Sequence, residues 1–307
     1  MGTTWHVTFL GSLKDADQVQ EGIELQLQRV NDSMSTYQPD SEISRFNDSP
    51  KQQAFSLSED FVAVLSAALL VGVASEGAYD VTVGPIVNLW GFGPELGPDN
   101  VPDPAALKAL VIKIGQDKLT LDSTNATVSK TDDLALDFSS IAKGYAVDQI
   151  ADWLLARGIA DFLVEVGGEV RVAGENGRGT NWRIAVESPD DMVGQVAAAL
   201  TLTDSGIATS GDYRNYFERD GKRYSHTIDP RTGYPVSHDL VSVTVVHPLA
   251  VMADAWATAL MVMGAEEGMR VALAENLAVY FIRRTEDNYQ ASHSPMFAAY
   301  LESAREK

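Results

Sequence analysis

The sequence predicts an α+β protein in which mostly antiparallel sheets pack against helices. Helical and extended segments follow one another without the regular β-α-β alternation that a parallel sheet needs. Short strands dominate from Trp182 onward, and the pair Gly167-Gly168 provides the positive φ angles of a hairpin turn. Because no repeat or linker interrupts the chain, we expect a single unit over residues 1–307, or two interlocked α+β subdomains with the active site between them.

Helical spacing of apolar residues, together with capping signals, predicts the helices. One begins after Ser58, a natural N-cap, and ends at Gly77. Ser139 or Ser140 is expected to cap another helix, which ends near Gly158. Further helices are expected over residues 15–33, from Asp103-Pro104 onward, and over residues 250–263 and 266–275.

Apolar alternation between turn signals predicts the strands. One hairpin is expected around Thr124-Asn125 and another around the paired glycines. Residues 77–93 are rich in glycine and aromatic residues, so we expect a functional surface loop there and no plain helix. Other strands are expected over residues 5–10, 184–187, 197–202, 206–209, 213–218, 223–228, 240–246 and 278–282.

The charge of the chain excludes some classes of partner. It has 23 basic and 43 acidic side chains, a net charge of -20, and therefore repels nucleic acid and anionic lipid. A phosphate-bearing ligand would need a metal ion, a few basic side chains or the N–H groups of a helix start. The absence of cysteine excludes disulfides and thiolate metal sites. No apolar run is long enough to span a membrane.

Four segments concentrate polar side chains and glycine in positions typical of loops and caps, where function is common. They are residues 34–47, 77–93, 137–144, and 225–233 together with 254–258.

Asp254 and Thr258 lie four residues apart on a helix, so their oxygens project from one face. A carboxylate and a hydroxyl, completed by carbonyl and water oxygens, suit magnesium or calcium. The alternative is that Asp254 caps its own helix and Thr258 bonds back to a backbone carbonyl, which is the more common arrangement for such a pair alone.

Lys143 lies in the first turn of a predicted helix, where N–H groups and the helix dipole attract a phosphate. The alternative is an ordinary serine-capped helix start. Asp137, just before it, could pair with Lys143 or bind the polar edge of a ligand ring.

Histidine side chains ordinarily titrate near neutral pH, so His226 could accept a proton from an attacking hydroxyl, although a single histidine in a strand is more often structural. Arg231 could bind a phosphate or pair with an aspartate. Four aromatic side chains in the polar segments could enclose a planar ring, although such residues are more often core: Tyr37, Tyr79, Trp90 and Phe92.

Together these segments closely resemble the FAD:protein FMN transferase (ApbE) family. The matching strings span nearly the whole chain in order. They are Met1-Gly-Thr-Thr, MSTYQPDSEISRFN (34–47), GAYDVTVGPIVNLWGFG (77–93), DFSSIAKGYAVD (137–148), GGEVR (167–171), IATSGDYRNYF (207–217), SHTIDPRTGYP (225–235) and ADAWATAL (253–260).

The resemblance implies an ApbE-like, T-fold-related α+β fold and Mg2+-dependent transfer of FMN from its substrate FAD to a Thr or Ser hydroxyl of an acceptor flavoprotein, such as a subunit of a membrane redox complex. AMP is released. It also implies that His226 is the general base. The implied metal ligands are Asp254 and Thr258, helped by Ser140 or by backbone oxygens at Ala142 and Ala257. The implied FAD contacts are Met1, Tyr37, Ala78, Tyr79, Asp80, Asp137 and Lys143, with Gly168 and Glu169 shaping the cleft.

Two rival functions use the same residues. With water as the acceptor, the protein would be a metal-dependent FAD pyrophosphatase, and without turnover it would be a flavin-binding carrier. Family members are usually exported and often lipid-anchored, so the resemblance also implies a periplasmic protein that is an inner-membrane lipoprotein in its full-length form. The leader and the anchoring cysteine are not part of this sequence.

Overall fold

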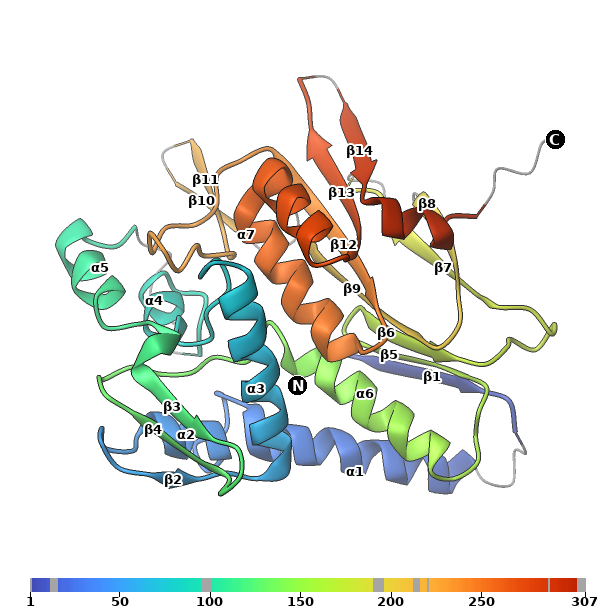
Figure 1. The fold of residues 1–307 in the computed structure, drawn as a ribbon, viewed down its shortest axis with the longest axis horizontal. Coiled ribbons are helices and arrows are strands. Elements are labelled where there is room, and N and C mark those ends of the chain that lie inside the picture. The colour runs from blue at the N-terminus through green and yellow to red at the C-terminus, as the bar shows by residue number, and fades with distance from the viewer. Residues whose placement is uncertain are drawn as a thin grey trace.

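A seven-stranded sheet runs through the centre of the molecule in the computed structural model (Figure 1). The structure describes residues 2–11, 16–94, 101–189, 196–211, 216–219, 221–286 and 288–302. All six pairings in this sheet are antiparallel, which confirms the predicted class. Its strands, in spatial order, are β1 (Trp5–Phe9), β5 (Phe162–Val166), β6 (Glu169–Ala173), β9 (Ser205–Gly211), β12 (Leu240–His247), β13 (Ala278–Arg284) and β14 (Tyr289–His293).

Helices cover one face of this sheet (Figure 1). The long helix α7 packs against β9 and β12, α6 packs against β5 and β6, and α1 and α3 lie outside them. The helices are α1 (Ala16–Met34), α2 (Glu42–Asn47), α3 (Glu59–Ala74), α4 (Gly84–Leu89), α5 (Pro104–Val111), α6 (Ala142–Leu155) and α7 (Ala250–Ala274).

The opposite face of the sheet is covered by a hairpin and a short 3-10 helix, Pro295–Tyr300. Apolar side chains of β7 (Trp182–Glu187) and β8 (Val196–Leu202) pack there with Val172 and Ile282 of the central strands. Because both faces are covered, β12 is buried along almost its whole length. Two small sheets complete the fold: β2 (Phe55–Ser56) with β4 (Thr127–Lys130) and β3 (Leu119–Asp122), and β10 (Tyr216–Arg219) with β11 (Lys222–Ser225).

Several predicted helix boundaries are confirmed by their caps. The Ser58 hydroxyl accepts a hydrogen bond from the Phe61 N–H, and the Asp103 carboxylate accepts from the first turn of α5. The two helices expected over residues 250–263 and 266–275 are the two halves of α7, which is broken by a kink at Gly264 (φ 77, ψ 173), where the prediction left a gap. Among the described residues, no helix is long and apolar enough to cross a membrane.

Other predictions were wrong. Neither Ser139 nor Ser140 caps α6. The helix begins at Ala142, and its N-cap residue is Ile141, whose side chain cannot cap it. Residues 77–93 are not a surface loop, because they contain α4 and the fully buried Trp90. The sequence analysis did not predict α2, β2 or β14, and part of the strand expected over residues 213–218 lies outside the described residues.

Each of α6 and α7 lacks an N-cap of its own and is capped by a carboxylate of the other. Asp148 of α6 accepts hydrogen bonds from the N–H groups of Ala250 (3.0 Å) and Val251 (2.9 Å) at the start of α7. Asp254 of α7 accepts from the N–H of Gly144 (2.9 Å) in the first turn of α6. These bonds satisfy helix-start donors that would otherwise be buried without partners.

Glycine makes this close approach of the two helix starts possible. A Cβ atom on Gly144 would lie 2.3 Å from the Ala250 carbonyl oxygen and 2.8 Å from the Asp254 Cβ. A Cβ atom on Gly206 of β9 would lie 2.5 Å from the Ala250 nitrogen. Arg171 of β6 pairs with Asp148 at 3.0 Å, so the junction is also tied to the central sheet. These close contacts therefore fix the positions of the two helix starts and β9 relative to one another.

We predict that Asp148→Asn will lower the free energy of unfolding by about 1 to 3 kcal/mol, because one buried N–H of α7 will face an amide NH2 and lose its acceptor. Chemical denaturation monitored by circular dichroism measures this change. The matched control is Asp152→Asn, because Asp152 pairs with the same Arg171 at 3.1 Å but is 59% exposed. Equal effects of the two substitutions would contradict a special role of the Asp148 cap.

Candidate active site

One cavity of about 670 Å³ collects most of the polar residues that the sequence analysis selected. Its walls come from the start of α6, the first half of α7, β9, the turn between β5 and β6, the segment before α4 and the segment after β11. The predicted site residues that line it are Tyr37, Ala78, Tyr79, Asp80, Asp137, Ser140, Lys143, Gly168, Glu169, His226, Asp254 and Thr258.

Three predicted residues are not in this lining. Ala257 is fully buried and Ala142 is partly buried, so only their backbone oxygens could serve a ligand. Met1 lies outside the described residues.

Asp254 and Thr258 do not behave as the structural alternative expected. Asp254 is 4% exposed and caps α6 instead of its own helix. Among the described residues, the Thr258 hydroxyl lies 3.1 Å from the Ser210 hydroxyl of β9 and does not bond back to a helix carbonyl. Both side chains therefore line the cavity, one helical turn apart, and provide oxygen atoms that can bind a hard cation.

Lys143 places its ammonium group between two buried carboxylates. Its Nζ atom is 3.5 Å from Glu169 Oε1 and 3.6 Å from Asp254 Oδ1, so its partners are these two and not Asp137. Burial lowers the pKa of Lys143, but the adjacent charges of Asp254 and Glu169 raise it by more, and the ammonium stays protonated. Burial and the charge of Asp254 raise the pKa of Glu169, against the opposing effect of Lys143.

The start of α6 offers less free backbone to an anion than the sequence suggested. The N–H groups of Ile141 and Ala142 both donate to the Phe138 carbonyl, and that of Gly144 donates to Asp254. The positive charge available to a phosphate at this helix start is therefore mainly the Lys143 side chain.

Tyr79, Asp80 and Asp137 form the side of the cavity next to Ser140. The Tyr79 hydroxyl is 3.0 Å from the Ser140 hydroxyl, and burial raises the pKa of Tyr79 far above its ordinary value, so it stays protonated. Burial also raises the pKa of Asp80, although the Thr82 hydroxyl and N–H donate to it. Asp137 accepts from the Ser139 N–H at 2.7 Å. The Tyr79–Ser140 contact holds the segment before α4 against the start of α6, and the other bonds order each segment locally.

His226 lies directly after β11, and its ring meets the edge of the Phe92 ring at 6.4 Å between centroids. Both residues line the cavity. The turn that follows closes on itself, because the Asp229 N–H donates to the Tyr234 carbonyl and the Val236 N–H donates to the Thr227 carbonyl. His226 is thus partly buried at the base of an ordered turn rather than on a free loop.

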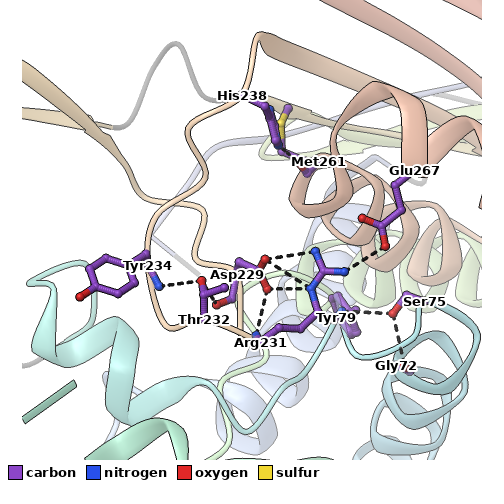
Figure 2. A network of polar contacts seen from close by, with 10 residues as sticks. All are labelled: Gly72, Ser75, Tyr79, Asp229, Arg231, Thr232, Tyr234, His238, Met261 and Glu267. Atoms are coloured by element: carbon purple, nitrogen blue, oxygen red, sulfur yellow. Dashed lines mark hydrogen bonds and ion pairs between the residues drawn. The ribbon is translucent and has the colours of Figure 1, made fainter. Parts of the chain in front are cut away.

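Arg231 anchors this turn to the far half of α7 (Figure 2). Its guanidinium group bonds to Asp229 at 3.0 Å and to Glu267 at 3.0 Å. The hydrogen bond to Asp229 raises the pKa of Arg231, opposed by partial burial. Because both partners are carboxylates of this chain, the aspartate-pair alternative holds and Arg231 does not line the cavity.

The four aromatic candidates separate into two groups. Tyr37, Tyr79 and Phe92 line the cavity, and Tyr37 is 73% exposed at its edge. Trp90 is fully buried, packs against Tyr224 and Tyr234, and donates to the Gly233 carbonyl at 2.9 Å. Trp90 is therefore a core residue that supports the turn after His226.

Sequence reasoning missed the contribution of β9 and of the helix-capping pair. Thr209 and Ser210 line the cavity from β9, and Asp148 with Arg171 positions α7 from behind. The only sequence signal for these residues was that they fall inside the matched strings. Neither their spacing nor their residue types predict a contact across more than 100 positions, such as that between Asp148 and Ala250.

The comparisons with known proteins agree over the whole chain. The sequence profile of the ApbE family matches residues 1–281. The chain belongs to the ApbE family.

The similarity of this ApbE chain to named relatives is high. It is 45% identical to the FAD:protein FMN transferase of Vibrio cholerae over 98% of this chain and 90% of the relative. It is 42% identical to that of Escherichia coli K12, over 99% of this chain and 88% of the relative.

Solved ApbE structures have the same fold. The flavin transferase ApbE from Vibrio cholerae matches with a TM-score of 0.91 at 44% identity, covering 98% of this chain and 96% of that one. The ApbE protein from Thermotoga maritima matches with a TM-score of 0.89 at 28% identity, covering 98% and 97%. The predicted ApbE-like fold is confirmed.

We predict that Arg231→Leu will leave the affinity for FAD within about twofold, because its guanidinium group is engaged by two carboxylates and not by a phosphate. Equilibrium titration of FAD fluorescence measures this affinity. The control is Arg270→Leu, which removes another exposed pair, with Glu76 at 2.9 Å. A loss of about tenfold or more specific to Arg231, equivalent to about 1.4 kcal/mol, would instead indicate a phosphate contact.

Proposed function

We propose that this protein is an FAD:protein FMN transferase, which cleaves the FAD pyrophosphate and joins FMN to a Thr or Ser hydroxyl of an acceptor flavoprotein. The observation that carries the proposal is that one cavity contains His226, Lys143, Asp254 and Thr258 together. These supply a proton acceptor, a positive charge and oxygen ligands for a cation. Membership of the ApbE family and the names of the relatives support the same function.

Magnesium is the proposed cation. The donors that face the cavity are a carboxylate and hydroxyls from Asp254, Thr258 and Ser140, an all-oxygen set of the kind magnesium takes. Among the described residues, no cluster of three His, Cys, Asp or Glu side chains could hold a metal by itself. Magnesium commonly binds through one or two carboxylates and completes its ligands with substrate phosphates and water, so this sparse set fits. When bound, the cation would neutralise charge that develops on the pyrophosphate.

The residues of the chain then have separate roles. His226 accepts the proton of the acceptor hydroxyl as its oxygen bonds to the phosphorus on the FMN side. The bond between that phosphorus and the bridging oxygen breaks, and the electron pair leaves with AMP. Lys143 stabilises negative charge on the phosphates, and the cavity wall that β9 and α7 form holds the reacting groups in position.

The side of the cavity formed by Tyr37, Tyr79 and Phe92 is the proposed place of the flavin. Two of these rings have a polar neighbour, since Tyr79 contacts Ser140 and Phe92 contacts His226. A planar ring bound against them would bring its ribityl phosphate toward the α6 start. Ala78, Asp80 and Asp137 border the same space and could bind polar edges of the ligand.

We predict that His226→Ala and Asp254→Asn will each reduce formation of AMP from FAD by at least about 100-fold, because each removes a group that acts on the reacting atoms. Chelation by EDTA should have the same effect on the unaltered protein, and added magnesium should restore it. Liquid chromatography of the nucleotide products measures the rate. His6→Ala is the histidine control, since His6 is 74% exposed on β1 and outside the cavity.

We predict that the acceptor, and not water, receives FMN. Incubation with FAD, magnesium and an acceptor flavoprotein should add one FMN group to the acceptor, which intact-protein mass spectrometry detects. An acceptor with its attachment Thr changed to Ala should stay unmodified. Free FMN and AMP with an unmodified acceptor would favour the pyrophosphatase, and intact FAD after long incubation would favour the carrier.

A further inference from the structure

The ammonium group of Lys143 occupies the space between the two most buried carboxylates of the cavity. Asp254 and Glu169 are each 4% exposed and belong to different elements, α7 and β6. The Lys143 Nζ atom is nearly equidistant from them, at 3.6 Å and 3.5 Å. Within the described residues it is the cation that both carboxylates share.

The two carboxylates differ in how completely the protein pairs them. The Gly144 N–H holds the second oxygen of Asp254 at 2.9 Å. The second oxygen of Glu169, Oε2, is buried and has no hydrogen-bond partner among the described residues. Buried carboxylates without full pairing need a compensating positive charge. Glu169 therefore has one oxygen that the protein alone does not satisfy.

The contacts of the ammonium group are longer than those of a tight pair. Charge-assisted N–H to carboxylate bonds are typically about 2.7–2.9 Å, and both distances here exceed that range. Lys143 also reaches the Ser139 carbonyl at 3.3 Å. The ammonium group is shared among three acceptors, and its long side chain can leave them without a backbone change.

A divalent cation at Asp254 would come into conflict with this ammonium group. Magnesium lies about 2.0–2.1 Å from its ligand oxygens, so it would lie within a few ångströms of an ammonium bonded to the same carboxylate. Like charges at such a distance repel strongly in a partly buried site. The ammonium group and the divalent cation therefore cannot both bind tightly in the space between Asp254 and Glu169.

We propose that Lys143 is a resident counter-ion that competes with the divalent cation for Asp254 and Glu169, and that Glu169 thereby belongs to the cation site. On cation binding the ammonium group moves to the phosphates of the dinucleotide. This last step rests on the proposed FMN transfer, whereas the competition rests only on the proposed cation site. The FAD-free protein then binds magnesium weakly, and cation and dinucleotide bind cooperatively because the nucleotide gives the displaced ammonium a new partner.

The test is magnesium binding to the FAD-free protein by isothermal titration calorimetry. Lys143→Met should bind magnesium at least about tenfold more tightly than the unaltered protein, because a competing positive charge is gone. The affinity of the same variant for FAD, measured without magnesium, should fall. The matched control is Lys51→Met, which removes the same charge from an exposed pair with Asp133 at 3.2 Å.

A second variant separates competition from a general effect of charge. Lys143→Met combined with Glu169→Gln should lose most of the gained magnesium affinity, since Gln at position 169 cannot carry the negative charge that a bound cation favours. If Lys143→Met is unstable, magnesium should raise its melting temperature more than that of the unaltered protein, because a ligand stabilises the state that it binds. Unchanged or weaker magnesium binding by Lys143→Met would overturn the proposal.

The outcome is independent of whether FMN is transferred. Tighter magnesium binding by Lys143→Met without any FMN transfer by the unaltered protein would refute the proposed function alone. Normal transfer together with unchanged magnesium affinity of the variant would refute the counter-ion role alone.

Discussion

The reciprocal capping of α6 and α7 is the interaction on which the arrangement of the cavity depends. Each helix begins without a cap from its own segment, and each receives a buried carboxylate from the other, Asp148 in one direction and Asp254 in the other. The residue that closes α6 is the same residue that faces the cavity as a candidate cation ligand. The same hydrogen bonds therefore hold the fold and position the site. A change in the contact between the starts of α6 and α7 would also move Asp254, the candidate cation ligand.

This sharing explains how a chain with a net charge of -20 can present a site for an anionic dinucleotide. Each of the two capping carboxylates has part of its charge balanced by helix-start N–H groups and part by a basic side chain, Arg171 or Lys143. The local balance near the phosphates is thus set by a few buried contacts. The excess acidic residues on the surface do not determine it, since their fields are screened by solvent.

How much of this was predictable from the sequence depended on the range of the interaction. Local signals located helices well, as Ser58, Asp103 and the gap at Gly264 show, because a cap or a break is determined by neighbouring residues. The same local rule was wrong for α6, since its cap comes from Asp254, 110 positions away. The surface loop expected over residues 77–93 was another failure: the segment is drawn inward because Trp90 packs against Tyr224 and Tyr234, which no spacing reveals.

The candidate site was found largely by resemblance, with chemistry as the filter. Their residue types showed that Asp254, Thr258, Lys143 and His226 could serve a phosphate-cleaving site. Only the matched strings indicated that the four belong to one site, and all four line the same cavity in the structure. Lys143 between Asp254 and Glu169 could not be anticipated, because the three come from α6, α7 and β6 and their contact is purely tertiary.

The two sides of the cavity are held by bonds of different kinds. The cation side is fastened by buried hydrogen bonds between helix starts, whereas the turn that carries the proton acceptor is fastened to α7 by Arg231, whose side chain and its partner Glu267 are each 34% exposed. Dissolved ions weaken exposed pairs far more than buried ones. Rising ionic strength should therefore weaken the link between this turn and α7 before it weakens the bonds of the cation side, while the buried Trp90 still supports the turn.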